Sequence, residues 1–474
     1  MKTEPKLTVS GYRGIWKKSL DNKIIENYTK SFIKFVKENI SENPTILLGR
    51  DGRESGPEIR ETIIKTLFCL GVHFVDGDIL PTPTILFAVN KNKYDSAIII
   101  TASHNPREYN GLKFVTNKAL FTDESEVEKI KENYLKNLIE GNKNKKFSFS
   151  SLFPHFSIFL HSPTCTIAPS TKSSHLNFTQ EHADQILKHI NVEKIRSQKF
   201  KIAVDMINAS ACVVDPYIFE QLGVELIPLN NIPDGKFAHK PEPIKENLND
   251  IALLVKEKNC NIGFAHDPDA DRLVVINEKG EILSEEYTLA LGVEAILSKN
   301  KNNKVVVNMS TSQMNKDIAL KYGGDCIRTK VGEANVVAGI IQNNAIIGGE
   351  GGGGIIYPTI NMARDSFVSF ALILELLSER NQTISECIES LPKYIIRKDK
   401  MPIQGNLGDM YLKIKNYYKD ATVNELDGLR LDFSDSSWLH IRPSNTEPIV
   451  RIYGEAKTQE RIDELFGEIK KLIS

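Results

Sequence analysis

Short apolar runs of β type alternate along this chain with amphipathic helical stretches, and this alternation constrains the fold more than any other feature. Three of the runs continue alike: TILLGRDGRES begins at Thr45, KIAVDMINAS at Lys201 and KVVVNMSTSQ at Lys304. Each is an apolar strand that enters a polar loop and then a helix, which is the order of a layered α/β unit. Three similar α/β units would produce this echo, although any α/β protein repeats strand, loop and helix.

Changes in composition place the domain boundaries. The 474 residues are enough for about three or four domains. A stretch rich in Ser, Phe and Pro at 145–175 reads as a linker or an insertion, and polar stretches at 298–304 and 397–402 indicate two more boundaries. The tail, with LRLDF, SWLHIRP and IVRIYGEA before a helical segment, predicts a compact α+β domain. We therefore expect domains at 1–150, 178–298, 299–397 and 398–474.

The charge and the cysteines argue against several classes of protein. A formal net charge of -1 gives no global field that would recruit nucleic acid or an anionic membrane. The six cysteines are scattered without a CxxC pair, which fits a reducing compartment. No run approaches the roughly 18 apolar residues of a membrane span, and the first residues lack the apolar core of a secretory signal. We expect a cytoplasmic protein, in which the run FVSFALILELL (367–377) is a buried helix.

The stretch YDSAIIITASHNPREYNG (94–111) ends an apolar run on a polar cluster that contains Ser103 and His104. A serine is a weak nucleophile unless it is activated or modified, and no GxSxG elbow surrounds this one. Neighbouring side chains on an extended segment point apart, which argues against a Ser103–His104 relay. A catalytic serine and a serine in a surface turn both remain open at this point.

Three carboxylates alternate in GFAHDPDADRLVVI (263–276), namely Asp267, Asp269 and Asp271. Alternate spacing in an extended or looped segment aims the three side chains in the same direction. Converging carboxylates repel one another unless a cation neutralises them, and oxygen ligands without Cys or His favour Mg²⁺ over zinc. A solvated acidic turn is the alternative, but such turns rarely lie between runs this apolar. The pattern favours a metal site.

Six of the seven residues from Gly348 to Gly354 are glycine, and Glu350 is the exception. Glycines let the backbone approach a ligand closely. The Gly-Lys-Ser/Thr ending of a phosphate-binding P-loop is missing, and an acidic residue in a glycine loop suits hydroxyl groups better than phosphate. A flexible hinge is the alternative interpretation of this loop.

The stretch HIRPSNTEPIVRIYGE (440–455) combines two arginines with a tight polar turn. Guanidinium groups, hydroxyls and backbone N–H groups together make a cradle for phosphate or carboxylate. A Ser-Asn-Thr turn flanked by surface arginines is the alternative. We favour an anion-binding site made of Arg442, Ser444, Asn445, Thr446 and Arg451.

Taken together and in this order, the four segments resemble the α-D-phosphohexomutase superfamily, which includes phosphoglucosamine mutases and phosphomannomutases/phosphoglucomutases. The resemblance runs from SGYRGIW to RIYGEA, and TASHNPREYNGLKF with DPDADR carries most of its specificity. It implies three related α/β domains and a smaller C-terminal α+β domain around a central cleft. The stretch 145–175 is longer than the family usually shows.

The resemblance also implies a chemistry. Ser103 would carry a phosphoryl group, with Mg²⁺ bound by its phosphate oxygen and by Asp267, Asp269 and Asp271. The enzyme would move a phosphoryl group between O6 and O1 of a hexose phosphate. The intermediate would be a hexose 1,6-bisphosphate, which would also act as the activator.

Other residues match site positions of the family one by one. Arg13 would lie near the phosphoserine, Lys113 would be the general acid/base, His104 would position the catalytic loop, and Arg272 would lie near the transferring phosphate. The substrate's sugar would be bound by Gly332, Glu333, Glu350 and Gly352. The spectator phosphate would be bound by Arg442, Ser444, Asn445, Thr446 and Arg451.

The glycine loop departs from the family pattern, which often reads Gly-Glu-x-Ser/Asn-Gly-His. Gly352 replaces the Ser/Asn and Gly354 replaces the His. The resemblance implies that two contacts to sugar hydroxyls would be missing. The stretches VGEANVV and GGEGGGGIIYP look most like proteins labelled phosphoglucosamine mutase, which convert glucosamine-6-phosphate to glucosamine-1-phosphate. Mannose and glucose phosphates are the alternative substrates.

Two remoter alternatives are a sugar-phosphate phosphatase and a non-catalytic protein that binds sugar phosphates. We expect a monomer or dimer that acts on a small molecule, with no nucleic-acid or membrane partner. The choice of sugar, the oligomeric state, the role of 145–175 and the first phosphorylation of Ser103 stay open from the sequence.

Overall fold

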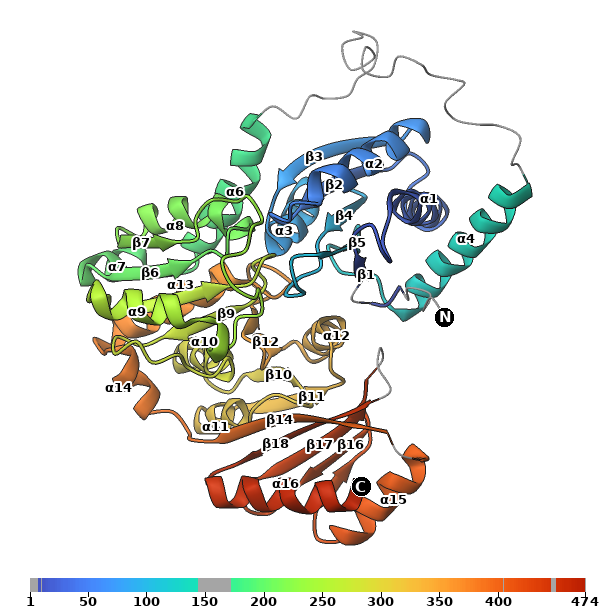
Figure 1. The fold of residues 1–474 in the computed structure, drawn as a ribbon. Coiled ribbons are helices and arrows are strands. Elements are labelled where there is room, and N and C mark those ends of the chain that lie inside the picture. The colour runs from blue at the N-terminus through green and yellow to red at the C-terminus, as the bar shows by residue number, and fades with distance from the viewer. Residues whose placement is uncertain (1–6, 10, 144–171, 404, 445–448, 474) are drawn as a thin grey trace. The chain divides into compact units, whose positions relative to one another are not determined.

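The structure is a computed structural model, and it describes residues 7–9, 11–143, 172–403, 405–444 and 449–473. The chain divides into two compact units. The first comprises Met1–His189, Ala203–Leu248 and Ala265–Asp271, and the second comprises Ile190–Ile202, Asn249–Phe264 and Arg272–Ser474. The described elements build four sheets, and each sheet carries its own helices (Figure 1). This confirms the predicted fold class of α/β domains followed by a C-terminal α+β domain.

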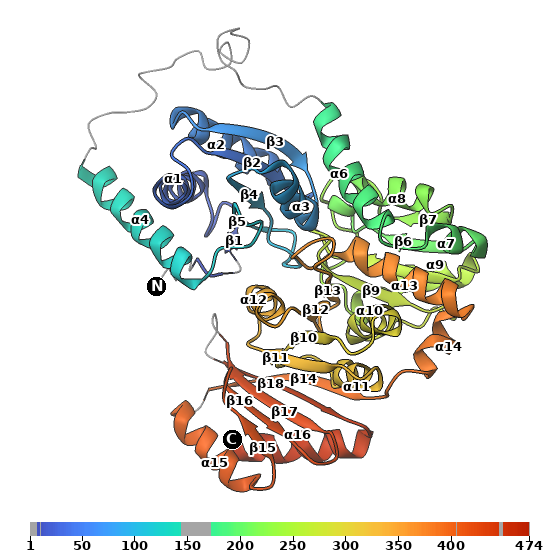
Figure 2. The ribbon, with the colours of Figure 1, turned by 180° about the vertical axis from the view of Figure 1, so that it is seen from behind.

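The first sheet has the strand order β1-β5-β4-β2-β3, and only β1/β5 and β4/β5 are antiparallel pairs. One face packs against α1, α2 and α4, because apolar residues of these helices share a core with alternate strand residues. Helix α3 packs against β2 and β4, and α6 packs on α3 (Figure 2). The bounds are β1 (Tyr12–Ile15), α1 (Asn22–Asn39), β2 (Thr45–Arg50), α2 (Gly56–Cys69), β3 (His73–Ile79), α3 (Thr82–Asn92), β4 (Ser96–Ile100), β5 (Tyr109–Thr116), α4 (Glu124–Lys143) and α6 (Lys172–Leu187).

The second sheet has the order β7-β6-β8-β9. The boundary between the two units runs through it, so that the end of β8 and the loop that follows belong to the first unit with Ser103. The bounds are α7 (Val192–Gln198), β6 (Lys201–Asp205), η2 (Ser210–Val213), α8 (Asp215–Gln221), β7 (Glu225–Leu229), η3 (Lys245–Asn247), α9 (Asn249–Glu257), β8 (Ile262–His266) and β9 (Leu273–Ile276).

The third sheet has the order β11-β10-β12-β13, with β12 and β13 paired as an antiparallel hairpin around the glycine turn. Helix α13 is buried along nearly its whole length, which confirms the buried helix expected at 367–377. Helix α10 packs against β12 and β13, whereas the expected boundary at residue 298 places it with the preceding domain. The bounds are α10 (Glu286–Lys299), β10 (Lys304–Asn308), α11 (Met314–Lys321), β11 (Asp325–Thr329), α12 (Glu333–Asn343), β12 (Ile347–Glu350), β13 (Gly354–Ile356), α13 (Ser366–Arg380) and α14 (Ile384–Glu389).

The fourth sheet is antiparallel throughout, in the order β14-β18-β17-β16-β15. Apolar residues of α15 and α16 cover one face of it. The stretch 397–402, expected at a domain boundary, lies within its edge strand β14. The bounds are β14 (Ile395–Pro402), α15 (Leu407–Tyr417), β15 (Thr422–Asn424), β16 (Leu429–Asp432), β17 (Trp438–Pro443), β18 (Ile449–Ala456) and α16 (Gln459–Ile473).

Among the described residues, no helix combines the length and the apolar character needed to cross a membrane.

Candidate active site

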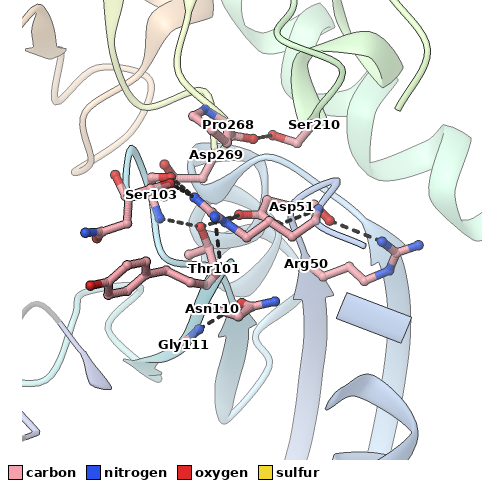
Figure 3. Close-up of polar contacts among 12 residues, drawn as sticks. Arg50, Asp51, Thr101, Ser103, Asn110, Gly111, Ser210, Pro268 and Asp269 are labelled. Atoms are coloured by element: carbon pink, nitrogen blue, oxygen red, sulfur yellow. Dashed lines mark hydrogen bonds and ion pairs between the residues drawn. The ribbon is translucent and has the colours of Figure 1, made fainter. Parts of the chain in front are cut away.

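Ser103 lies in the loop between β4 and β5 and is buried, with 1% of its surface exposed. Its φ of 51° is in the left-handed region, which a non-glycine residue adopts only when its surroundings hold it there. Thr101 provides part of that support, because its Oγ1 accepts a hydrogen bond from Ser103 N at 2.8 Å and donates one to Asp51 at 2.7 Å (Figure 3). The serine is thus fixed at the end of a buried strand and not on a mobile surface turn.

The left-handed backbone at Ser103 overturns one expectation. Side chains of Ser103 and His104 were expected to point apart, but Oγ of Ser103 lies 3.3 Å from Nδ1 of His104. The expectation was wrong because it assumed an extended segment, in which successive side chains alternate. Arg13, on β1, donates a hydrogen bond to the Asn105 side chain at 2.8 Å, so it lies against the same loop.

Arg53 is a site residue that the sequence interpretation missed. The side chain of Arg53 is fully buried and pairs with Asp51 at 3.0 Å. The same side chain binds the main chain of the Ser103 loop. The guanidinium donates to four carbonyl oxygens of this loop, those of Ser103, Asn105, Pro106 and Tyr109. The only local signal was the polar loop GRDGRES after an apolar strand, and this pattern does not indicate which residues Arg53 contacts.

The three aspartates converge directly after β8. Asp267, Asp269 and Asp271 are buried, and carboxylate oxygens of the three lie within 4.8 Å of one another. Their loop is anchored by Ser210, whose Oγ donates to the carbonyl of Pro268 at 2.7 Å (Figure 3). Ser103 Oγ lies 3.3 Å from Oδ2 of Asp267, so the predicted serine and the predicted metal loop meet.

Lys113 completes this cluster from the neighbouring strand β5. Its Nζ lies 2.7 Å from Oδ2 of Asp269 and 3.7 Å from Oδ2 of Asp271. Thr82, at the start of α3, also donates to Asp269 at 2.9 Å. Burial acts to raise the pKa of Asp269, but the nearby ammonium group outweighs it and holds the pKa far below its usual range. Asp269 is therefore a carboxylate at neutral pH.

The donor set fits a divalent cation. Three buried carboxylates converge beside the ammonium group of Lys113, and the charge of Arg13 also acts on Asp269. The carboxylates outnumber these two cationic groups, so a divalent cation would help to balance them. Within the described residues, Oδ1 of Asp269 is buried and receives no hydrogen bond. Oxygen ligands alone match the preference of Mg²⁺, and Asp267, Asp269 and Asp271 would hold it.

In the second unit, three predicted residues distant in sequence lie together. The Glu350 side chain at the end of β12 accepts hydrogen bonds from Gly332 N at 2.9 Å and from Asn308 at 2.8 Å. Arg364 bridges Glu350 and Glu333, with 3.1 Å to each carboxylate. Asn308 and Arg364 were not predicted, because their roles depend on contacts between β10, β12 and the segment before α13.

The two arginines of the expected anion cradle are direct partners across β17 and β18. Side chains opposite each other on an antiparallel pair share a face, so Arg442 and Arg451 concentrate positive charge there. Nε of Arg442 is buried and donates no hydrogen bond to any of the described residues. Its nearest carboxylate oxygen in an ion pair is Oδ2 of Asp427, at 3.9 Å. Ser444 follows β17 directly, and its backbone N–H donates to the carbonyl of Ile449 at 2.9 Å. Asn445 and Thr446 lie outside the described residues.

Arg272 approaches Gly352: its Nη1 would lie 3.6 Å from a Cβ at that position.

Comparison with known proteins gives the class. Four domain families, all described as phosphoglucomutase/phosphomannomutase, match in sequence order: alpha/beta/alpha domain I at 5–139, domain II at 180–280, domain III at 284–394 and the C-terminal domain at 405–472. With the fold above, these matches define a phosphohexomutase, an isomerase that moves a phosphoryl group within a hexose phosphate.

Curated relatives match nearly the whole chain. A phosphoglucomutase/phosphomannomutase of Thermococcus kodakarensis is 32% identical over 96% of this chain and 95% of its own length. A phosphoglucosamine/phosphogalactosamine mutase of Sulfurisphaera tokodaii is 31% identical over 98% of both. A phosphoglucosamine mutase of Methanocaldococcus jannaschii is 31% identical over 98% of this chain and 97% of its own. The chain belongs to the phosphoglucomutase/phosphomannomutase family of the α-D-phosphohexomutase superfamily.

Solved structures share the fold. A family protein from Burkholderia thailandensis has a TM-score of 0.79 at 23% identity, covering 99% of this chain and 96% of its own. An N-acetylphosphoglucosamine mutase of Aspergillus fumigatus, solved with GlcNAc-6P and magnesium, has a TM-score of 0.59 at 13% identity, covering 100% and 96%. At these identities the likeness supports the four-domain fold alone.

Proposed function

We propose that this phosphohexomutase interconverts glucosamine-6-phosphate and glucosamine-1-phosphate, with Ser103 as the residue that carries the phosphoryl group. The observation that carries the proposal is the 3.3 Å approach of Ser103 Oγ to Asp267 within a buried cluster that also contains Lys113. A buried serine beside three carboxylates and an ammonium group is well placed for phosphoryl transfer. A purely structural serine would not need these charged neighbours.

The proposed reaction has two transfers. In the first, phosphorylated Ser103 gives up its phosphoryl group: the bond between phosphorus and Ser103 Oγ breaks, and a bond forms between phosphorus and O1 of the sugar in the hexose 6-phosphate. The product is a hexose 1,6-bisphosphate. After the bisphosphate reorients, its 6-phosphoryl group returns to Ser103 Oγ and the 1-phosphate is released. Lys113 would accept the proton of the attacking hydroxyl in its neutral amine form, after its ammonium group has released a proton, and would return the proton to the departing oxygen. A trace of the bisphosphate would prime any Ser103 that has lost its phosphoryl group.

The other residues would bind and orient. Arg13 and His104 would keep the Ser103 loop in place, and Arg272 would face the transferring group. A Mg²⁺ held by Asp267, Asp269 and Asp271 would offset the negative charge of the phosphoryl group. The sugar hydroxyls would be bound by Gly332, Glu333, Glu350 and Gly352, and the second phosphate by Arg442, Ser444, Asn445, Thr446 and Arg451.

Two observations support an amino sugar. Two of the relatives that match over 98% of this chain are named for glucosamine phosphate. In addition, Glu333 and Glu350 share one guanidinium, that of Arg364, so this cluster keeps a net negative charge. Such a cluster favours a sugar with an ammonium group over one with hydroxyls alone. The name of the Thermococcus relative supports mannose and glucose phosphates as the second candidate.

The test is ³¹P NMR of the purified chain with Mg²⁺ and a trace of hexose 1,6-bisphosphate. Separate samples hold glucosamine-6-phosphate, mannose-6-phosphate and glucose-6-phosphate. We expect a 1-phosphate signal that grows fastest with glucosamine-6-phosphate. Fastest growth with mannose or glucose phosphate would overturn the proposed sugar, and release of inorganic phosphate without an isomer would indicate a phosphatase.

Ser103→Ala is the matching test of the serine, with Ser125→Ala as the control because Ser125 is exposed on the same unit. Loss of the phosphoryl acceptor should lower turnover by about three orders of magnitude or more, in the range seen when a nucleophile is removed. Circular dichroism should show an intact fold. Near-normal turnover of Ser103→Ala would refute the phosphoserine mechanism.

A further inference from the structure

The glycine turn between β12 and β13 has a position that cannot carry a side chain. A Cβ at Gly354 would lie 2.4 Å from Cδ of Arg364, 2.8 Å from its Cγ and 3.1 Å from its Cβ. These atoms belong to the stem of the arginine, close to its backbone, so they cannot move aside as a side-chain tip can. The space that a side chain at 354 would fill is therefore taken by Arg364.

Arg364 is itself held on both sides of this stem. Its backbone forms an antiparallel bridge with Ile356 of β13, and the next residue, Asp365, donates its N–H to Ile355 at 2.9 Å. At the far end of the side chain, the guanidinium donates hydrogen bonds to Glu350 and Glu333, each at 3.1 Å. The backbone N–H of Arg364 donates a further bond to the Glu333 carboxylate at 2.9 Å. The residue is 8% exposed.

Gly352, two residues earlier in the same turn, provides the contrast. The nearest atom to a Cβ at this position is Nη1 of Arg272 at 3.6 Å, an ordinary van der Waals distance. A small side chain therefore fits at 352 and not at 354, although the sequence shows glycine at both. The two departures from the family pattern thus differ: the structure has room for a side chain at 352, whereas Arg364 excludes one at 354.

We propose that Arg364 replaces the side chain missing at 354 and is the positioning residue that sets the sugar preference of this turn. The proposal rests on the proposed function of the turn as the sugar site. Glu350 receives three hydrogen bonds, from Gly332, Asn308 and Arg364. A carboxylate accepts about four, so Arg364 decides which direction remains for a substrate donor.

This arrangement predicts how the sugar choice responds to residue 364. The fork of Arg364 reaches two carboxylates at once, which a lysine ammonium cannot do in the same geometry. Arg364→Lys keeps the charge of the residue but releases one of the two carboxylates, which changes how the positive charge is shared between Glu333 and Glu350 and shifts the position of Glu350. The ratio of kcat/KM between glucosamine-6-phosphate and mannose-6-phosphate should therefore change by about tenfold, the effect of one misplaced polar contact.

The experiment uses the full-length chain and five variants: Gly352→Ala, Gly354→Ala, Arg364→Ala, Arg364→Lys and the double variant Gly354→Ala/Arg364→Ala. Thermal unfolding and kcat and KM for both sugar phosphates are measured for each. Gly352→Ala should keep the melting temperature of wild type, because a Cβ there meets no atom closer than Nη1 of Arg272 at 3.6 Å. Gly354→Ala should lose about tenfold or more in kcat/KM, because it displaces the arginine that positions Glu350.

The double variant isolates the packing claim. Adding Gly354→Ala to the Arg364→Ala background should lower the melting temperature much less than adding it to the wild-type background, because Cδ and Cγ at 2.4 and 2.8 Å are gone and only Cβ at 3.1 Å remains. Equal losses in both backgrounds, or an unchanged sugar ratio in both Arg364 variants, would overturn the proposal. A wild-type chain that isomerises no hexose phosphate contradicts the proposed function as well, whereas turnover with an unchanged ratio contradicts only the role of Arg364.

Discussion

The guanidinium of Arg53 shows how a buried charge can serve a single loop. The group is fully buried and makes five polar interactions, with Asp51 and with four main-chain carbonyl oxygens around Ser103. A buried charge is tolerated only when it is paired and its hydrogen bonds are satisfied. The arrangement explains how Ser103 keeps a left-handed φ of 51°.

Replacing Arg53 by Ala should destabilise the chain by about 3–5 kcal/mol, because Asp51 is left buried and unpaired. The measurement is the urea concentration at the midpoint of unfolding. Arg107→Ala is the control: Arg107 pairs with Glu54 at 2.7 Å, but both side chains are nearly half exposed. Its loss should be about 0–1 kcal/mol. Similar losses in the two variants would show that Arg53 does not hold the loop.

At the residue scale, the sequence predicted side chains whose local pattern carries chemistry. The alternating Asp267, Asp269 and Asp271 do converge, and Ser103 lies beside them. Arg53 and Arg364 could not be predicted, because each is defined by partners in other elements and has no motif of its own. The relation of His104 to Ser103 was predicted wrongly, since a left-handed residue cannot be read from one sequence. The roles of all these residues in catalysis stay predictions.

At the element scale, helix α10 starts with a buried carboxyl group. Glu286 is 1% exposed and accepts a hydrogen bond from Ser312 N at 3.0 Å. Burial raises its pKa to about 8, although Lys398 opposes this from 3.5 Å. The side chain also closes the space behind Gly351, where a Cβ would lie 2.2 Å from the carboxylate.

The raised pKa of Glu286 predicts a pH dependence of stability. Between the ordinary pKa of 4.5 and the folded value of about 8, the folded chain keeps a proton that the unfolded chain has released. Folding therefore takes up protons in this window, and the free energy of unfolding from this group falls as pH rises from about 5 to 8.

Glu286→Gln should remove this contribution and flatten the pH profile over that window. Urea unfolding at several pH values measures it, with Glu257→Gln, an exposed residue of α9, as the control. A profile of Glu286→Gln as steep as that of the wild type would contradict the assignment.

The sequence predicted elements best where periodicity is strong. The runs at Thr45, Lys201 and Lys304 are β2, β6 and β10, each followed by a helix, and the helical tail is α16. In the last domain, three strands were expected, and the sheet contains β14 and β15 as well. Strand β14 was missed because its charged alternation, RKDK, looks like a boundary; an edge strand exposes one face and tolerates such residues.

At the scale of the whole molecule, the domain echo in the sequence predicted repeated α/β units, and four sheets are found. The contact between Ser103 and Asp267 joins residues 164 positions apart, and no local pattern gives such a distance. The family resemblance supplied that link where composition and spacing could not. Each unit then offers its own test, because the aspartates lie in the first and the arginine pair in the second.

For the first unit, we expect Mg²⁺ to stabilise the folded chain. Three buried carboxylates repel one another, and a cation that binds only the folded state raises stability by about 2.7 kcal/mol at a concentration of 100 times its Kd. Differential scanning calorimetry with and without Mg²⁺ measures the shift in melting temperature. The shift should vanish in Asp267→Asn and persist in Asp420→Asn, whose side chain is exposed. An equal shift in both variants would argue against a site at the three aspartates.

For the second unit, the cradle can be tested by removing one of its two charges. Arg442 and Arg451 face each other across β17 and β18, and like charges directly opposite destabilise a sheet unless an anion neutralises them. Arg442→Ala should raise KM for the hexose phosphate by about 10- to 100-fold, the value of one charge-assisted hydrogen bond or slightly more. Turnover at saturation should fall less, because the lost contact is made equally in ground and transition states.

The control for this variant is Arg461→Ala on the same unit, where Arg461 pairs with Asp435 at 3.0 Å at the surface and has no role in the cradle. Inorganic phosphate provides a second readout that does not depend on turnover. It should raise the melting temperature of wild type and of Arg461→Ala, and the increase should be smaller in Arg442→Ala. An unchanged KM in Arg442→Ala, together with an undiminished effect of phosphate on its melting temperature, would show that Arg442 does not belong to the cradle. No bound anion would then account for the placement of Arg442 opposite Arg451.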